Sequence, residues 1–180
     1  MMDKNQKLLA AKNSIRQVKD YPKKGIVFQD ITTLLRDDAH LKSVSDEICD
    51  FYADKNITKV VGMESRGFIF GAILAYRLNV GFIPIRKPGK LPYGVYSEKY
   101  VLEYGFDELQ IHKDALDGGD VVLLHDDLLA TGGTAAASLK LIENFNVEKI
   151  YVNFMVELSF LNGRKKINSK YPVHSLFQLD

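Results

Sequence analysis

The stretch VVLLHDDLLATGGTAAAS, residues 121–138, decides the fold of this chain. It opens with an apolar run that reads as a short buried strand, Val121–His125, and closes with small residues that begin a helix. Between the two lie a pair of carboxylates, Asp126 and Asp127, and the turn TGGT at 131–134. In an open parallel sheet, ligands bind outside the carboxyl ends of the strands. We therefore expect both acids and the turn to border a ligand site.

The rest of the chain repeats this alternation of short apolar strands and amphipathic helices, which indicates βαβ units and a parallel sheet. The expected strands span 59–63, 81–85, 121–125 and 149–156, and the expected helices span 8–18, 41–51, 68–78 and 134–145. Pro84 favours an edge position or a strand end for its segment. The Gly/Pro-rich stretch 86–96 is expected to be irregular, and 97–102 can pair with 108–111 as extended chain. We expect one α/β domain over residues 1–180, with a central parallel sheet flanked by helices and a small N-terminal cap.

Composition narrows the class of protein. The formal net charge is +1, so no global electrostatic attraction to nucleic acid or to an anionic membrane is expected. The single cysteine, Cys49, has no partner for a disulfide and reads as a small core residue. The N-terminus has no apolar stretch typical of a secretory signal, and the uncharged segment 67–76 is too short to span a bilayer. A soluble, cytoplasmic protein that binds neither nucleic acid nor membrane is expected.

The turn TGGT has the chemistry of an anion site. Glycines let the backbone approach an anion closely, and the first amide groups of a helix attract a phosphate. Carboxylates repel phosphate, so their presence beside the turn makes sense for a ligand that carries both hydroxyls and phosphate. The acids then accept hydrogen bonds from a ribose diol or position a metal-bound water. A Walker A loop is excluded because no Gly-Lys-Ser/Thr follows. The alternative interpretation is a plain strand–turn–helix connection capped by a threonine.

Residues 121–134 resemble the 5-phosphoribosyl-1-pyrophosphate (PRPP) signature of the type I phosphoribosyltransferases, in which four apolar residues, two acids and two apolar residues precede a TGGT-like turn. His125 departs from the usual apolar residue. Two interpretations of it stay open: a core histidine bonded to a backbone group, or a residue bordering the site. The resemblance implies that the ribose and the 5′-phosphate are held by Asp126, Asp127, Ala130, Thr131, Gly132, Gly133 and Thr134.

Further segments resemble one branch of that family, the adenine phosphoribosyltransferases. These segments are YPKKGIVFQDIT at 21–32, ESRGF at 64–68, RKPGKLP at 86–92, LEYG at 102–105 and VEL at 156–158. The resemblance implies the type I phosphoribosyltransferase fold, a base-binding N-terminal segment over 1–35 and a flexible catalytic loop over 86–105. It also implies a non-proline cis peptide bond near 63–65.

The same resemblance assigns roles to individual residues. Glu103 is expected to exchange a proton with the purine; without the LEYG context it reads as a surface glutamate. Pyrophosphate is expected to contact Ser65, Arg66, Arg86, Lys87, Lys90 and Tyr104, where the alternative for the cations is solvated loop charge. Adenine is expected to contact Val27, Phe28, Gln29 and Leu158, with Ala130 packing beside it.

The activity implied is transfer of the phosphoribosyl group from PRPP to adenine, giving AMP and pyrophosphate. Mg²⁺ is implied as cofactor, bound through PRPP oxygens and water with no direct protein ligand, as suits a cation that dehydrates reluctantly. A homodimer is also implied. Two alternatives remain: a related enzyme acting on a 6-oxopurine, and a PRPP-sensing regulator without catalysis. The intact loop and Glu103 favour an enzyme.

Overall fold

The computed structural model describes residues 2–101 and 105–180. The chain divides into two compact units, Met1–Phe51 and Tyr52–Asp180, and each is described by itself. Among the described residues, no helix is long and apolar enough to cross a membrane.

The first unit combines helices with one small hairpin. Its elements are α1 (Lys4–Ser14), β1 (Arg16–Lys19), β2 (Val27–Asp30), α2 (Thr32–Leu35) and α3 (Asp38–Tyr52). A capping box starts α1: the Gln6 amide donates to the Asp3 carboxylate at 2.8 Å, and the Asp3 amide donates to the Gln6 side chain at 3.0 Å. The helix expected over 8–18 ends at Ser14, because the next residues pair antiparallel with β2, Val18 opposite Phe28.

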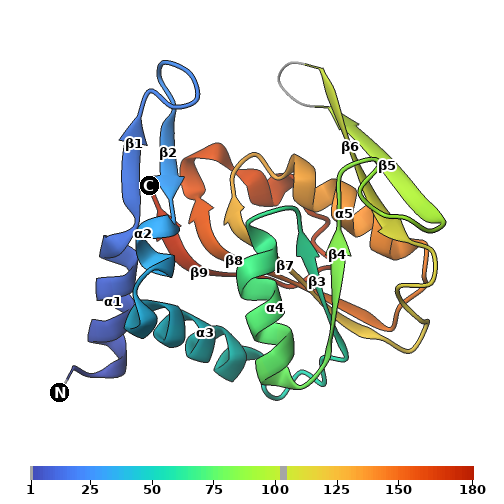
Figure 1. The fold of residues 1–180 in the computed structure, drawn as a ribbon, viewed down its shortest axis with the longest axis horizontal. Helices are drawn as coiled ribbons and strands as arrows, with labels where there is room; N and C mark the ends of the chain where they lie inside the picture. The colour runs from blue at the N-terminus through green and yellow to red at the C-terminus, as the bar shows by residue number, and fades with distance from the viewer. Residues whose placement is uncertain (1, 102–104) are drawn as a thin grey trace. The chain divides into compact units, whose positions relative to one another are not determined.

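The second unit is built on a five-stranded sheet in the order β4-β3-β7-β8-β9, and every pair in it is parallel (Figure 1). Its strands are β3 (Lys59–Met63), β4 (Gly81–Ile85), β7 (Val121–Leu129), β8 (Lys149–Leu158) and β9 (Val173–Leu179), and its helices are α4 (Gly67–Leu78) and α5 (Gly133–Glu143). Two short 3-10 helices, η1 (Ser159–Leu161) and η2 (Gly163–Lys166), follow β8. The expected central parallel sheet flanked by helices is confirmed, and Pro84 lies in an edge strand as predicted.

An antiparallel hairpin packs alongside α5 (Figure 1). It is formed by β5 (Val95–Val101) and β6 (Phe106–His112), which confirms the predicted pairing of these segments. Two residues of the stretch expected to be irregular, Val95 and Tyr96, belong to β5. Side chains of the hairpin, of α5 and of one sheet face form a common buried core that includes Leu109, Ile111 and Leu124.

Strand β7 is longer than predicted. It was expected to end at His125, yet it continues through both acids to Leu129, because β8 extends equally far and pairs with it, Leu129 opposite Glu157. The last strand, β9, was not predicted at all. It pairs with β8 from Val152 to Leu158 and completes the sheet on that side.

Candidate active site

The turn between β7 and α5 forms a small pocket. Gly132 adopts a left-handed backbone conformation, φ +79°, which favours glycine, and the helix α5 begins at the next residue. The pocket has a volume of about 80 Å³, and it is lined by Asp126, Leu128, Leu129, Ala130, Thr131, Gly132, Gly133, Thr134, Ala135 and Phe154. Six of the seven residues predicted to hold ribose and phosphate therefore share one cavity at the start of a helix. Such a helix start attracts an anion.

The seventh, Asp127, points elsewhere, because successive side chains of a strand face opposite sides. Its carboxylate is buried, with Oδ2 2.9 Å from Nε of Arg66 at the start of α4. The two acids still touch, since the Asp127 amide donates to Oδ1 of Asp126 at 2.9 Å. Arg66, predicted to contact pyrophosphate, thus also pairs with an acid of the signature.

Burial sets the electrostatics of this acid pair. It raises the pKa of Asp126 well above the usual carboxyl range, and the neighbouring Asp127 charge raises it further. Burial also raises the pKa of Asp127, although the Arg66 guanidinium acts in the opposite direction. Two adjacent carboxylates whose ionised forms are disfavoured have a strong demand for hydrogen-bond donors or cations. A ribose diol, or a ligand that carries positive charge, meets this demand.

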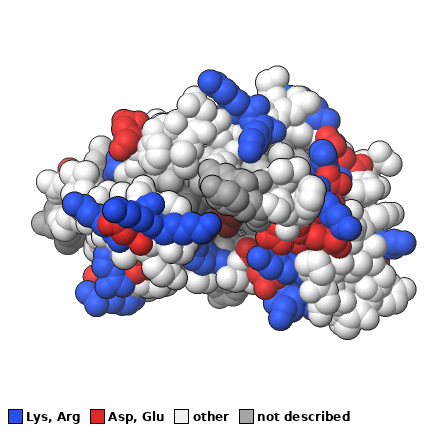
Figure 2. All heavy atoms as spheres, turned by 90° about the horizontal axis from the view of Figure 1, so that it is seen from above, with Lys and Arg blue, Asp and Glu red and all other residues white. Residues whose placement is uncertain are grey.

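Cations gather beside the pair, at the carboxyl ends of β3 and β4. The Glu64 carboxylate accepts from Nη2 of Arg86 at 3.2 Å and from the Lys87 amide at 2.7 Å. Burial raises the pKa of Glu64, but these hydrogen bonds outweigh it and the net shift is downward. The peptide bond Glu64–Ser65 is cis, as predicted. Ser65, Arg66, Arg86 and Lys87 are therefore supplied by neighbouring strand ends. On the face shown in Figure 2, basic and acidic side chains lie interspersed.

The hairpin reaches the phosphate turn through Tyr100, a residue that sequence reasoning missed. Thr134 Oγ1 lies 3.4 Å from the Tyr100 hydroxyl, which lies 3.3 Å from the Asp107 carboxylate. Asp107 in turn pairs with Nζ of Lys87 at 3.1 Å. The ring of Tyr100 also packs on Gly133, where a Cβ would lie 3.4 Å from it. The sequence signal that could have identified Tyr100 is an aromatic residue at an alternating position of a predicted strand.

Comparison with known proteins decides the family. The phosphoribosyl transferase domain model matches residues 30–178. An adenine phosphoribosyltransferase of Bacteroides thetaiotaomicron is 57% identical over 166 residues, covering 92% of this chain and 94% of that protein. The chain belongs to the adenine phosphoribosyltransferase family. Another member, from Clostridium kluyveri, is 54% identical over 168 residues, covering 93% of this chain and 97% of its own.

Solved structures of adenine phosphoribosyltransferases have the same fold. The Rhodothermus marinus enzyme matches with a TM-score of 0.92 and 46% identity, covering 97% of this chain and 99% of that one. The Giardia lamblia enzyme, complexed with 9-deazaadenine, matches with a TM-score of 0.92 and 41% identity, covering 100% and 99%. The family resemblance drawn from the sequence motifs is confirmed over nearly the whole chain.

The remaining residues predicted from the adenine phosphoribosyltransferase pattern belong to different units or lie outside the described residues. Val27, Phe28 and Gln29 lie in β2 of the first unit, and Leu158 ends β8 in the second. Glu103 and Tyr104 lie outside the described residues. Lys90 lies near enough for its charge to lower the pKa of Glu64. The adenine contacts and the catalytic glutamate therefore stay predictions.

His125 is a core residue. Its side chain is fully buried, its Nδ1 lies 2.8 Å from Oδ1 of Asn153, and its ring contacts that of Phe70 on α4. The prediction of a backbone partner was wrong, because the side-chain amide of Asn153 opposite it in β8 takes that place. Nδ2 of Asn153 in turn lies 3.0 Å from Nδ1 of His174. Burial lowers the pKa of His125 to about 4.

Proposed function

We propose that this protein transfers the 5-phosphoribosyl group of PRPP to adenine, forming AMP and releasing pyrophosphate. The observation that carries the proposal is the pocket in which Asp126 faces the glycine turn at the start of α5. That pocket offers acceptors for ribose hydroxyls and amide donors for a phosphate within one cavity, and the family to which the chain belongs supports the reaction.

In this mechanism Asp126, which lines the pocket, accepts hydrogen bonds from the ribose hydroxyls, and Asp127 lies beside it on the opposite face of β7, paired with Arg66. Breaking the bond between C1′ and pyrophosphate leaves positive charge on the ribose ring, and a nearby carboxylate pair stabilises it. The backbone of Ala130, Thr131, Gly132, Gly133 and Thr134 holds the 5′-phosphate. Because the acids act on the ribose and the turn binds its 5′-phosphate, the two acids and the phosphate turn lie next to each other.

Pyrophosphate leaves toward the cations at the ends of β3 and β4. Arg66, Arg86, Lys87 and Lys90 neutralise its charge, and Ser65 and Tyr104 donate hydrogen bonds. Segment 86–105 closes over the reacting atoms and excludes water, which would otherwise hydrolyse PRPP.

Mg²⁺ fits this site as a partner of PRPP rather than as a resident ion. In the described part of the chain, no group of three or more His, Cys, Asp or Glu side chains is arranged to hold a metal. The oxygens of Asp126 and Asp127 suit a hard cation through bridging water. When bound, the ion supplies charge neutralisation for the pyrophosphate group.

Glu103 accepts a proton from adenine as the purine nitrogen attacks C1′, and returns it in the reverse reaction. Adenine itself contacts Val27, Phe28, Gln29, Ala130 and Leu158, and a 6-oxopurine is rejected through mismatch of donors and acceptors at a buried polar edge. On family resemblance alone, we also propose that the protein is a homodimer and is located in the cytoplasm.

The test is nucleotide formation from PRPP and Mg²⁺ with adenine, hypoxanthine or guanine offered separately. AMP from adenine alone supports the proposal. Nucleotide from hypoxanthine or guanine instead would favour the 6-oxopurine alternative. PRPP binding without any nucleotide would favour a sensor.

Replacing Glu103 separates the enzyme from the sensor. Glu103→Ala should lower kcat by ~10²–10⁴ while PRPP still binds, because only the proton transfer is removed. Steady-state kinetics with calorimetric PRPP titration measures both quantities. Asp114→Ala, at an exposed acid with no role in the proposed mechanism, serves as the control. An unchanged kcat in Glu103→Ala would contradict the catalytic role.

A further inference from the structure

The phosphate turn rests on a second backbone segment that the sequence motifs did not reveal. A Cβ built on Gly132 would lie 2.2 Å from the carbonyl oxygen of Gly163, and a Cβ on Gly163 would lie 2.2 Å from that of Ala130. Contacts this short leave no room for any side chain at either glycine. The two backbones therefore touch directly, and the position of η2 limits where the turn can lie.

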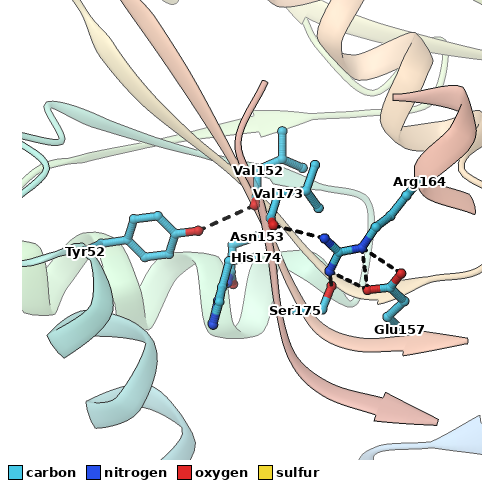
Figure 3. A network of polar contacts seen from close by, with 8 residues as sticks. All are labelled: Tyr52, Val152, Asn153, Glu157, Arg164, Val173, His174 and Ser175. Atoms are coloured by element: carbon cyan, nitrogen blue, oxygen red, sulfur yellow. Dashed lines mark hydrogen bonds and ion pairs between the residues drawn. The ribbon is translucent and has the colours of Figure 1, made fainter. Parts of the chain in front are cut away.

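A dense set of hydrogen bonds fixes η2 through the residue after Gly163. The Nε of Arg164 lies 2.8 and 2.9 Å from the two carboxylate oxygens of Glu157, and its Nη2 lies 2.7 Å from Oε2 (Figure 3). The remaining donors reach β9: Nη1 donates to the Val173 carbonyl at 3.1 Å, and Nη2 to Ser175 Oγ at 3.1 Å. One guanidinium thus ties η2 to the ends of two strands.

This arrangement requires arginine rather than positive charge alone. The planar fork meets a carboxylate, a carbonyl and a hydroxyl in fixed directions, which a lysine ammonium cannot reproduce. The Glu157 side chain is 8% exposed, and its hydrogen bonds to Arg164 lower its pKa despite burial, so the acid is a fixed, ionised anchor.

We propose that Arg164 is a positioning residue for the 5′-phosphate: anchored by Glu157, Val173 and Ser175, it holds Gly163 against the backbone of the phosphate turn. The turn's amide groups are thereby fixed before the phosphate arrives. The energetic gain is preorganisation, since a turn free to shift by about 1 Å would lose much of its affinity for the transition state. This inference rests on the proposed function of the turn.

The test compares Arg164→Met and Arg164→Lys with Lys165→Met, a matched control. Lys165 is the next residue of η2, and it is exposed. Binding of ribose 5-phosphate and of AMP is measured by calorimetry, together with KM for PRPP and for adenine. Both Arg164 variants should raise the Kd of ribose 5-phosphate and the KM of PRPP by about 10- to 100-fold. The KM of adenine at saturating PRPP and the constants of Lys165→Met should not change.

A folded Arg164→Lys protein that binds ribose 5-phosphate as tightly as wild type would overturn the inference, because a purely structural arginine leaves ligand affinity intact. If Arg164→Met does not fold, Arg164→Lys and Ser175→Ala carry the test. Ser175→Ala removes one hydrogen bond and should raise the same Kd about threefold.

The readout separates this inference from the proposed function. Ribose 5-phosphate binding requires no catalysis, so a wild-type chain that binds it without forming AMP would sink the proposed reaction and leave the positioning test valid. If the wild-type chain forms AMP but folded Arg164 variants bind ribose 5-phosphate as tightly as wild type, the proposed reaction stands and the positioning role of Arg164 is overturned.

Discussion

Two buried carboxylates of the same sheet are each paired with an arginine, and they behave in opposite ways. Asp127 in β7 lies 2.9 Å from Arg66, yet burial raises its pKa. Glu157 in β8 receives three close contacts from Arg164, which lower its pKa. One pair is electrostatically strained and the other is satisfied. The difference separates a site prepared for a ligand from the support that holds it.

The cause lies in the neighbours of each acid. Asp127 follows Asp126, so two carboxylates meet in a buried place, and the Asp127 charge disfavours ionisation of Asp126. Glu157 lies between Val156 and Leu158 with a guanidinium fork and a serine hydroxyl nearby. Strained ionisable groups gather at functional sites because a ligand relieves the strain. The substitutions below test whether this contrast has the expected consequences.

Among the substitutions that test this contrast, the largest effect on activity is expected for Asp126→Asn. The amide keeps the shape of the side chain but removes the charge that favours a ribosyl cation, so kcat/KM should fall by ~10²–10³. Stability should rise at the same time, by up to about 2 kcal/mol, because a disfavoured buried charge is lost. Kinetics and denaturant unfolding measure the two quantities. Asp54→Asn, at an exposed aspartate, is the control.

A loss of stability in Asp126→Asn would show that the acid pair is satisfied in the ligand-free protein. The contrast with Glu157 would then fail.

The opposite sign is expected for Glu157→Gln. Removing the charge weakens several hydrogen bonds to Arg164, so the free energy of unfolding should fall by about 1–3 kcal/mol. Urea unfolding at pH 7 measures this change. Glu148→Gln, an acid near the start of β8, is the control. Unchanged stability would mean that the pair is merely solvated and cannot anchor η2.

The pH dependence sharpens the comparison. The folded-state pKa of Glu157 is depressed, so its stabilising contribution is present above the unfolded pKa of about 4.3 and is lost as pH falls through the folded value. The folded-state pKa of Asp126 is raised, so its ionisation destabilises the folded protein as pH rises above the unfolded value of about 3.9. Unfolding of both variants from pH 4 to 8 should therefore give differences from wild type of opposite sign. As the pH is lowered, the difference in unfolding free energy between Asp126→Asn and wild type should shrink before that of Glu157→Gln does. Differences of equal sign would contradict both assignments.

The extent to which the sequence predicts the fold and the candidate site differs between regions of the chain. The strand–acid–turn–helix order of residues 121–134 reports local structure, because apolar strands and glycine turns are set by nearby residues. It predicted that Asp126 and the turn lie together, although Asp127 points to the other face and β7 runs four residues further than expected. The extension depends on pairing with β8, a long-range contact that the local pattern does not record.

The support of the turn was not predicted for the same reason. Gly163 and Arg164 lie about 30 residues after the turn, in a polar stretch that reads as solvated charge. Their roles depend on backbone contact with Gly132 and on β9, which the sequence did not reveal. The signal available was a glycine directly before an arginine, which gains meaning only when the sheet order is known. Local motifs identify what touches a ligand more readily than what holds those residues still.

The smallest effect on activity is expected at His125, a buried residue that is not paired with a charged group among the described residues. It is fully buried next to Asp126, and burial lowers its pKa to about 4, so it is neutral throughout the working range. His125→Val should therefore leave the shape of the pH–rate profile between pH 6 and 9 unchanged. It should cost about 1–3 kcal/mol of stability, because Oδ1 of Asn153 loses its partner. Kinetics across this pH range, with unfolding at pH 7, measures both. A shifted profile would mean that the ring titrates and takes part in the site. Superimposable curves would leave the strained acid pair as the origin of any acidic limb.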